Sequence, residues 1–136
     1  MLCLKEVEVF KLTKINSDST PKAIGGYSQA LLVENANRLL FISGQIPVGK
    51  NGDVPRDFES QCRLTWCNIL EQLKAADMEA KNLVKVTTYL SSREFADTNG
   101  TVRRELLGSH NPALTVIIAD IFEENWLLEI EAYAAA

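Results

Sequence analysis

The sequence predicts an α+β domain in which a mixed β-sheet is covered on one face by two helices. Two long stretches repeat apolar residues at helical spacing, and six shorter ones show the alternation or apolar runs typical of strands. Their order is three strands, a helix, a strand, a helix and two strands. Helix-linked strands are usually parallel and hairpin-linked strands antiparallel, so both kinds of pairing are expected in one sheet.

The composition is that of an ordinary globular domain, and residues 1–136 are expected to form a single one. Of the 136 residues, 46% are hydrophobic and 24% are charged, which suffices for a core without disulfides. The net charge of −4 argues against a nucleic-acid partner, because such proteins usually carry a basic patch. The sequence shows neither a secretory signal nor a membrane span, which favours a cytoplasmic protein without a membrane partner.

The cysteines and the histidine predict neither a metal site nor a disulfide framework. Cys3, Cys62 and Cys67 form no Cys-x-x-Cys pair, and His110 is the single histidine. Structural zinc sites need four such ligands at characteristic spacings, so no metal is expected. Cys62 and Cys67 are interpreted as small apolar residues on the buried face of a helix.

The first half of the chain is expected to supply three strands and a turn-rich loop. Residues 5–12 alternate acids with valines and predict a first strand. Residues 16–27 are rich in Asn, Ser, Pro and Gly and predict a surface loop. The apolar runs 30–34 and 38–46 are separated by a short Asn-rich segment, which predicts a β-hairpin.

Ser43, Gly44 and Gln45 interrupt the third strand where apolar residues are expected. A glycine within a strand often marks a bulge, or the close approach of another backbone or of a ligand. A plain strand end before Pro47 explains the same residues equally well, so both interpretations stay open.

The helices have recognisable ends. Asp57 is a good N-cap for an amphipathic helix over residues 58–78. A second helix is expected to begin near Ser91 or Ser92 and to stop at Gly108.

Asn99 falls within the inward stripe of the second helix, which is otherwise formed by Phe95, Val102 and Leu106. An amide that faces inward must find hydrogen-bond partners or a ligand. A structural hydrogen bond to a neighbouring loop is the ordinary explanation, and a ligand contact is the alternative.

The last two strands carry the remaining candidates. Residues 111–122 are almost wholly apolar and predict a core strand buried on both faces, with Leu114 near its start. The final strand, over residues 127–136, places Glu129 and Glu131 on one side. Such a side is ordinarily solvated, because carboxylates are mostly exposed.

Several strands are apolar on both faces, but two helices cover only one face of a sheet. The uncovered face therefore needs another layer, and a homo-oligomer supplies it. On that view Ser43, the Lys85–Thr87–Tyr89 side of the fourth strand and the two glutamates lie near subunit contacts, where ligand clefts are common.

The sequence resembles the Rid (reactive intermediate deaminase) family, also called YjgF or L-PSP endoribonuclease-like proteins. The resemblance covers roughly residues 20–134, nearly the whole chain, in the family's order and spacing. Its pieces are PKAIGGYSQA (21–30), FISGQIPVGKNGDVP (41–55), NLVKVTTYL (82–90), EFADTNGTV (94–102), NPALTV (111–116) and LLEIEAYA (127–134).

This resemblance implies a chorismate-mutase-like α+β fold, assembled as a homotrimer with a ligand cleft at each subunit interface. Better-known members are deaminases that hydrolyse enamines and imines to a 2-oxo acid and ammonia, with no cofactor of their own. Position by position, Tyr27, Ser43 and Asn99 match residues that line that cleft. Glu129 matches the acid that positions the attacking water.

Two positions depart from the family pattern. Active deaminases carry an arginine that binds the substrate carboxylate in a Pro-Ala-Arg-Ser segment, and here Leu114 stands in its place. An apolar side chain cannot replace bidentate pairing with a carboxylate. Gly26 replaces a proline that is usual in the glycine loop, which is expected to loosen that loop.

Two functions therefore remain open. The first is a hydrolase of imines, enamines or similar small molecules, with Glu129 as its acid or base and a non-standard substrate. The second is a non-catalytic trimeric module that binds a metabolite or a protein, and the ribonuclease activity in the family's older name fits the acidic charge poorly. Lys85, Arg103 or Arg104 could supply the missing charge, although both arginines are expected to be solvated helix residues.

Overall fold

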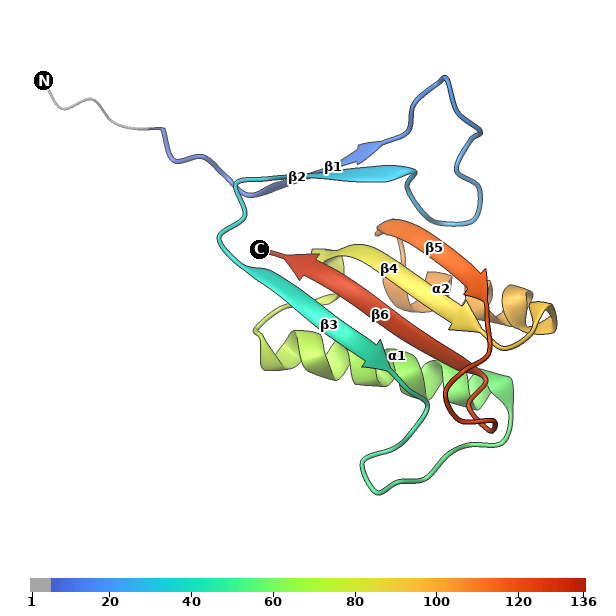
Figure 1. Ribbon diagram of the computed structural model, residues 1–136. Coiled ribbons are helices and arrows are strands. Elements are labelled where there is room, and N and C mark those ends of the chain that lie inside the picture. Colours follow the sequence, from blue (N-terminus) through green and yellow to red (C-terminus); the bar gives the residue numbers. More distant parts are fainter. Residues whose placement is uncertain (1–5) are drawn as a thin grey trace, which may run out of the picture.

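The computed structural model describes residues 6–136, which form a sheet of four strands, two helices on one of its faces and a separate two-stranded hairpin (Figure 1). Within this part of the chain, no helix is long and apolar enough to span a membrane. The expected element order is confirmed. The first strand, expected over residues 5–12, begins later, and residue 5 itself lies outside the described part.

The main sheet has the order β3-β6-β4-β5 and is mixed, as predicted. Its strands are β3 (Leu39–Gln45), β4 (Leu83–Leu90), β5 (Ala113–Ile118) and β6 (Leu128–Ala135). β6 pairs antiparallel with both β3 and β4, whereas β4 and β5, which α2 connects, run parallel.

The helices are α1 (Phe58–Ala75) and α2 (Ala96–Leu107), and short 3-10 turns precede β4 and α2. Both helices lie on the same face of the sheet (Figure 1). The core forms between the layers, where Trp66 and Ile69 of α1 are completely buried, as are Leu90 and Ile130 of the sheet. Cys62 is buried there as expected. Cys67 is exposed, so its assignment to the buried face was wrong.

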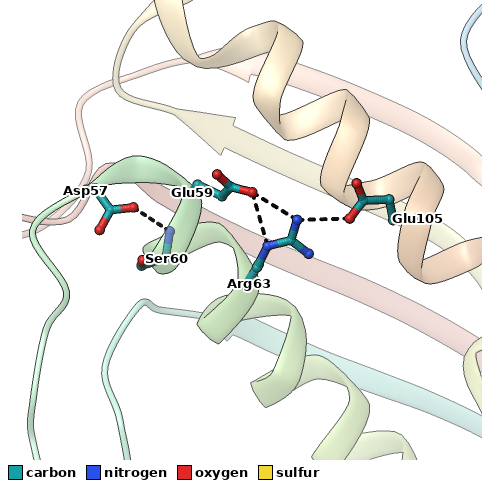
Figure 2. A network of polar contacts seen from close by, with 5 residues as sticks. All are labelled: Asp57, Glu59, Ser60, Arg63 and Glu105. Atoms are coloured by element: carbon teal, nitrogen blue, oxygen red, sulfur yellow. Dashed lines mark hydrogen bonds and ion pairs between the residues drawn. The ribbon is translucent and has the colours of Figure 1, made fainter.

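Polar contacts define the start of α1 and join it to α2 (Figure 2). The Asp57 carboxylate accepts a hydrogen bond from the Ser60 backbone N–H at 2.9 Å, which confirms the predicted N-cap. That N–H lowers the pKa of Asp57. Arg63 donates to Glu59 on its own helix and to Glu105 on α2, both at 2.9 Å.

The N-terminal strands pair differently from the prediction. β2 (Ala30–Glu34) pairs antiparallel with β1 (Lys11–Ile15), and the expected hairpin between β2 and β3 is wrong. The backbone N–H groups of Asn37 and Arg38, which would start that hairpin, donate instead to the carbonyl of Ala136 at 2.8 Å. The β1–β2 pair therefore lies apart from the main sheet (Figure 1).

β5 is an edge strand rather than a strand buried on both faces. Val116, Ile117 and Ile118 are 38%, 46% and 37% exposed, and Phe122 after the strand is 87% exposed. Periodicity reports the apolar character of a strand but not its position in the sheet, which explains the wrong expectation. A single chain thus leaves apolar surface open along this edge.

The sheet face opposite the helices is also open and partly apolar. Phe41 is 72% exposed on this face and packs beside Tyr133, with ring centroids 5.3 Å apart. Leu39 at the start of the same edge strand is 65% exposed. Contiguous exposed apolar surface of this kind commonly marks an interaction site.

Candidate active site

Glu129 lies on the open face of the sheet, because the side chains of β6 alternate between the two faces. Its neighbours Leu128 and Ile130 are completely buried towards the helices. Tyr89 of β4 is directly opposite Glu129 in the antiparallel register. Glu129 lines a hollow of about 260 Å³ whose other walls are Gly44, Tyr89, Asp120, Ile121 and Glu131.

Gly44 sits against Glu129 where the strand register shifts between Ile42 and Gln45, which is the signature of a bulge. A Cβ on Gly44 would stand 2.8 Å from the Glu129 carboxyl carbon and would overlap one of its oxygens. The bulge is therefore confirmed. The group that closely approaches Gly44 is the Glu129 side chain, rather than another backbone or a ligand. Ser43 lies beside Gly44 on the same edge strand and is exposed.

The two glutamates share one side of β6, as predicted, but their surroundings differ. Glu131 accepts a hydrogen bond from the Tyr89 hydroxyl at 3.1 Å, and this bond is the main reason why the pKa of Tyr89 is raised. The Glu129 carboxylate makes no hydrogen bond or ion pair with any residue from 6 to 136. Of the two carboxylates, Glu129 is therefore the one available to a ligand or a water molecule.

Tyr27 belongs to a different part of the molecule. It lines a hollow of about 430 Å³, together with Asn111 and residues of the 16–23 loop. The backbone N–H of Ser28 donates to the carbonyl of Pro112 at 3.1 Å, and its hydroxyl donates to the carbonyl of Asn111 at 2.6 Å. These bonds fasten the glycine loop to the start of β5.

Gly26 in this loop has a φ of +78°. Proline is locked near −65°, so the loop follows a path that proline would not allow. A Cβ at Gly26 would also stand 2.9 Å from Cγ of Arg104, whose stem passes over the loop. A glycine is therefore required here by both backbone conformation and packing.

Asn99 is 2% exposed on the inner side of α2. Among residues 6–136, its side-chain partner is the thiol of Cys62 on α1, with Sγ 4.0 Å from Oδ1. The expected bond to a neighbouring loop does not form. Burial raises the pKa of Cys62 to about 12, so this partner is a neutral thiol at physiological pH.

Arg103 lies one turn after Asn99 on the same side of α2 and is 5% exposed. Its Nη2 donates to the carbonyl of Gly25 at 2.7 Å, which joins α2 to the glycine loop. The expectation that Arg103 is solvated is thus wrong, whereas Arg104 is exposed as expected. The sequence contained the signal, because 99 and 103 are spaced like the inward pair 102 and 106.

Leu114 faces the helices, because it is in register with the completely buried Val86 of β4, and it packs against the core. Glu129 faces the other way. Their rows in the sheet, Val86 with Leu114 and Tyr89 with Glu129, are three residues apart, roughly 10 Å along the strands. One chain therefore does not bring Glu129 together with Leu114 or with the Tyr27 loop at the start of β5.

The comparisons with known proteins identify the family. The profile of the family described as Endoribonuclease L-PSP matches residues 17–136. The chain belongs to this family. Its other names are Rid and YjgF, so the resemblance read from the sequence is confirmed.

Relatives in the Rid family resemble this chain over most of their length. A RutC family protein of Pyrococcus horikoshii is 37% identical, with 88% of this chain and 94% of the relative covered. The 2-iminobutanoate/2-iminopropanoate deaminase of Escherichia coli K12 is 32% identical over the same shares of both chains. The crystal structure of the Rid protein YyfB from Yersinia pestis has the same fold, with a TM-score of 0.83, 23% identity and coverage of 92% of this chain and 98% of that one.

Proposed function

We propose that this Rid protein is a hydrolase of small imines or enamines and that Glu129 activates the water. The observation that carries the proposal is the Glu129 carboxylate, which has no partner among residues 6–136 and faces a hollow on the open side of the sheet. A carboxylate within hydrogen-bond reach of water can accept its proton as the oxygen attacks the imine carbon. As the C–N bond breaks, the water oxygen becomes the oxygen of the new C=O group. The nitrogen leaves as ammonia after taking up the two protons of the water.

We propose further that the working site forms between copies of the chain in a homotrimer. Two observations support this arrangement. The matched residues fall into separate groups on one chain, with Glu129 on the open face and Leu114 on the helix face. The open face and the β5 edge also expose apolar side chains, including Phe41 and Ile117, that a second copy would cover.

The mass in solution tests the assembly. We expect light scattering coupled to gel filtration to give three times the 15.1 kDa of one chain, and Phe41→Glu to reduce the assembled fraction, because a charge would be buried in the contact. Thr101→Glu on the exposed side of α2 is a matched control that should leave the mass unchanged. A wild-type chain that stays monomeric at micromolar concentration would refute the trimer.

Position 114 bears on the choice of substrate. Leu114 packs against the core and carries no charge, so a substrate carboxylate cannot be held from this position as an arginine would hold it. The proposed substrate therefore either has no carboxylate, or has a carboxylate that a residue other than 114 binds.

A direct assay tests the activity. The purified protein is given 2-iminobutanoate, released in place from threonine by a dehydratase, and the formation of 2-oxobutanoate and ammonia is followed. We expect both to appear faster than in the spontaneous reaction. Because Leu114 and Glu129 lie apart on one chain, we expect Leu114→Arg to increase the rate only through the proposed homotrimer, where position 114 of one copy serves Glu129 of another; thermal melting checks that this variant folds. If neither protein accelerates hydrolysis, the non-catalytic binding module is the better description.

A further inference from the structure

Arg103 is a buried cation that has no anionic partner among residues 6–136. The residue is 5% exposed, and no carboxylate of residues 6–136 lies within ion-pair distance of it. Its Nε is buried and has no hydrogen-bond partner in the same part of the chain. Within the described residues, the guanidinium makes one hydrogen bond, from Nη2 to the carbonyl of Gly25.

This arrangement is costly for a group that only supports the fold. Moving a charge out of water is unfavourable unless an opposite charge and a full set of hydrogen bonds replace the solvent. One carbonyl satisfies one of the five guanidinium N–H groups. Burial, and secondly the charge of Arg104, lower the pKa of Arg103, in line with the cost of burying this cation.

The surroundings are suited to a small anion. Asn99 lies one turn before Arg103 on the same side of α2, and the amide of Asn99 adds a second kind of donor. Cys62, which touches Asn99, is a neutral thiol and does not repel an anion. Gly25 belongs to an exposed loop, and no atom of the described residues lies within 4 Å of the position that a Cβ of Gly25 would take, so the loop itself is not packed in at this point.

The other two cations considered for this role are less well placed. Lys85 donates to the hydroxyl of Thr115 at 2.6 Å on the open face of the sheet, away from α2. Arg104 is exposed, with its aliphatic stem over Gly26 and its guanidinium beside Gly100. A solvated charge contributes much less to binding than a desolvated one.

We propose that Arg103 and Asn99 bind the carboxylate of a small-molecule ligand and so anchor it from α2 in place of position 114. This inference rests on the proposed function, because it makes a 2-imino acid, rather than a neutral imine, the substrate. The carbonyl of Gly25 in the glycine loop accepts a hydrogen bond from the same guanidinium. A bound carboxylate would compete with this carbonyl, so we expect the loop to move when the ligand binds.

The test compares the binding of 2-oxobutanoate with that of its uncharged amide, by calorimetry on the purified protein. We expect the carboxylate to bind more tightly than the amide, and Arg103→Met to weaken carboxylate binding by about tenfold or more while leaving amide binding unchanged. Arg104→Gln is the matched control on the neighbouring exposed position, and it should bind as the wild type does.

Thermal melting separates this role from a structural one. An arginine that is buried without an anionic partner and makes one hydrogen bond within residues 6–136 should contribute little to stability, so Arg103→Met should melt at the wild-type temperature or above it. A lower melting temperature together with unchanged carboxylate binding would show that Arg103 only holds the loop, and would overturn the inference. If Arg103→Met does not fold, Arg103→Lys keeps the charge but loses the planar fork, and unchanged affinity in that variant would equally overturn it.

The outcomes also separate this inference from the proposed function. If carboxylate binding depends on Arg103 but the protein does not accelerate imine hydrolysis, the proposed hydrolase activity is refuted and the proposed anion site is supported. If Arg103→Met does not change the rate of hydrolysis, the proposed hydrolase activity is supported and the proposed anion site is refuted.

Discussion

Replacing Glu129 by Gln is expected to lower kcat/KM for 2-iminobutanoate hydrolysis by about a hundredfold or more, because general acid–base catalysis typically contributes this much. The amide has nearly the same shape but cannot accept the proton of the attacking water. We therefore expect the loss in kcat, with KM little changed. Initial rates of ammonia release across a range of dehydratase-supplied substrate give both values.

Glu71→Gln is the control for the Glu129 substitution, since it removes a carboxylate from an exposed position on α1. It should retain wild-type kinetics and the wild-type melting temperature. An activity of Glu129→Gln within a few-fold of the wild type would mean that another group activates the water.

The second large effect is expected at Gly44. In Gly44→Ala the new methyl group would overlap the Glu129 carboxylate, which must then move away from the bulge. A displacement of about 1 Å at a reacting group can cost about a hundredfold in rate. The stability cost should be small by comparison, because the atoms that must move are at the far end of a flexible side chain. Kinetics and thermal melting on the same preparation test both parts.

The double variant checks that both substitutions act on one carboxylate. If Gly44→Ala works only by displacing Glu129, adding it to Glu129→Gln should cause little further loss of rate. Two losses that multiply would instead show that Gly44 matters through the shape of β3. Thermal melting of the double variant excludes simple unfolding as the cause.

Local patterns in the sequence were sufficient for much of the fold. Asp57 predicted the start of α1 because a carboxylate at that position caps backbone N–H groups of the first turn. Alternation in β6 predicted that Glu129 and Glu131 share a side, because successive side chains of a strand point to opposite faces. Gly44 allowed two interpretations, and the register shift between Ile42 and Gln45 identifies the bulge.

The tertiary arrangement was needed wherever the answer depended on a partner distant in the sequence. β2 pairs with β1, and the N–H groups of the turn before β3 donate to the carbonyl of Ala136 instead of starting a β2–β3 hairpin. The apolar pattern of a strand does not show whether that strand lies at the edge of a sheet. The sequence therefore predicted that β5 is buried on both faces, whereas β5 is an edge strand.

The candidate site divides in the same way. Its residue types were readable from the sequence, including Glu129 and the leucine at position 114. That Glu129 and Leu114 face opposite sides of one sheet follows from strand register, and the burial of Arg103 follows from the packing of α2 against the glycine loop. Hydrophobic spacing tells which side of an element turns inward, whereas long-range contacts determine what that side meets.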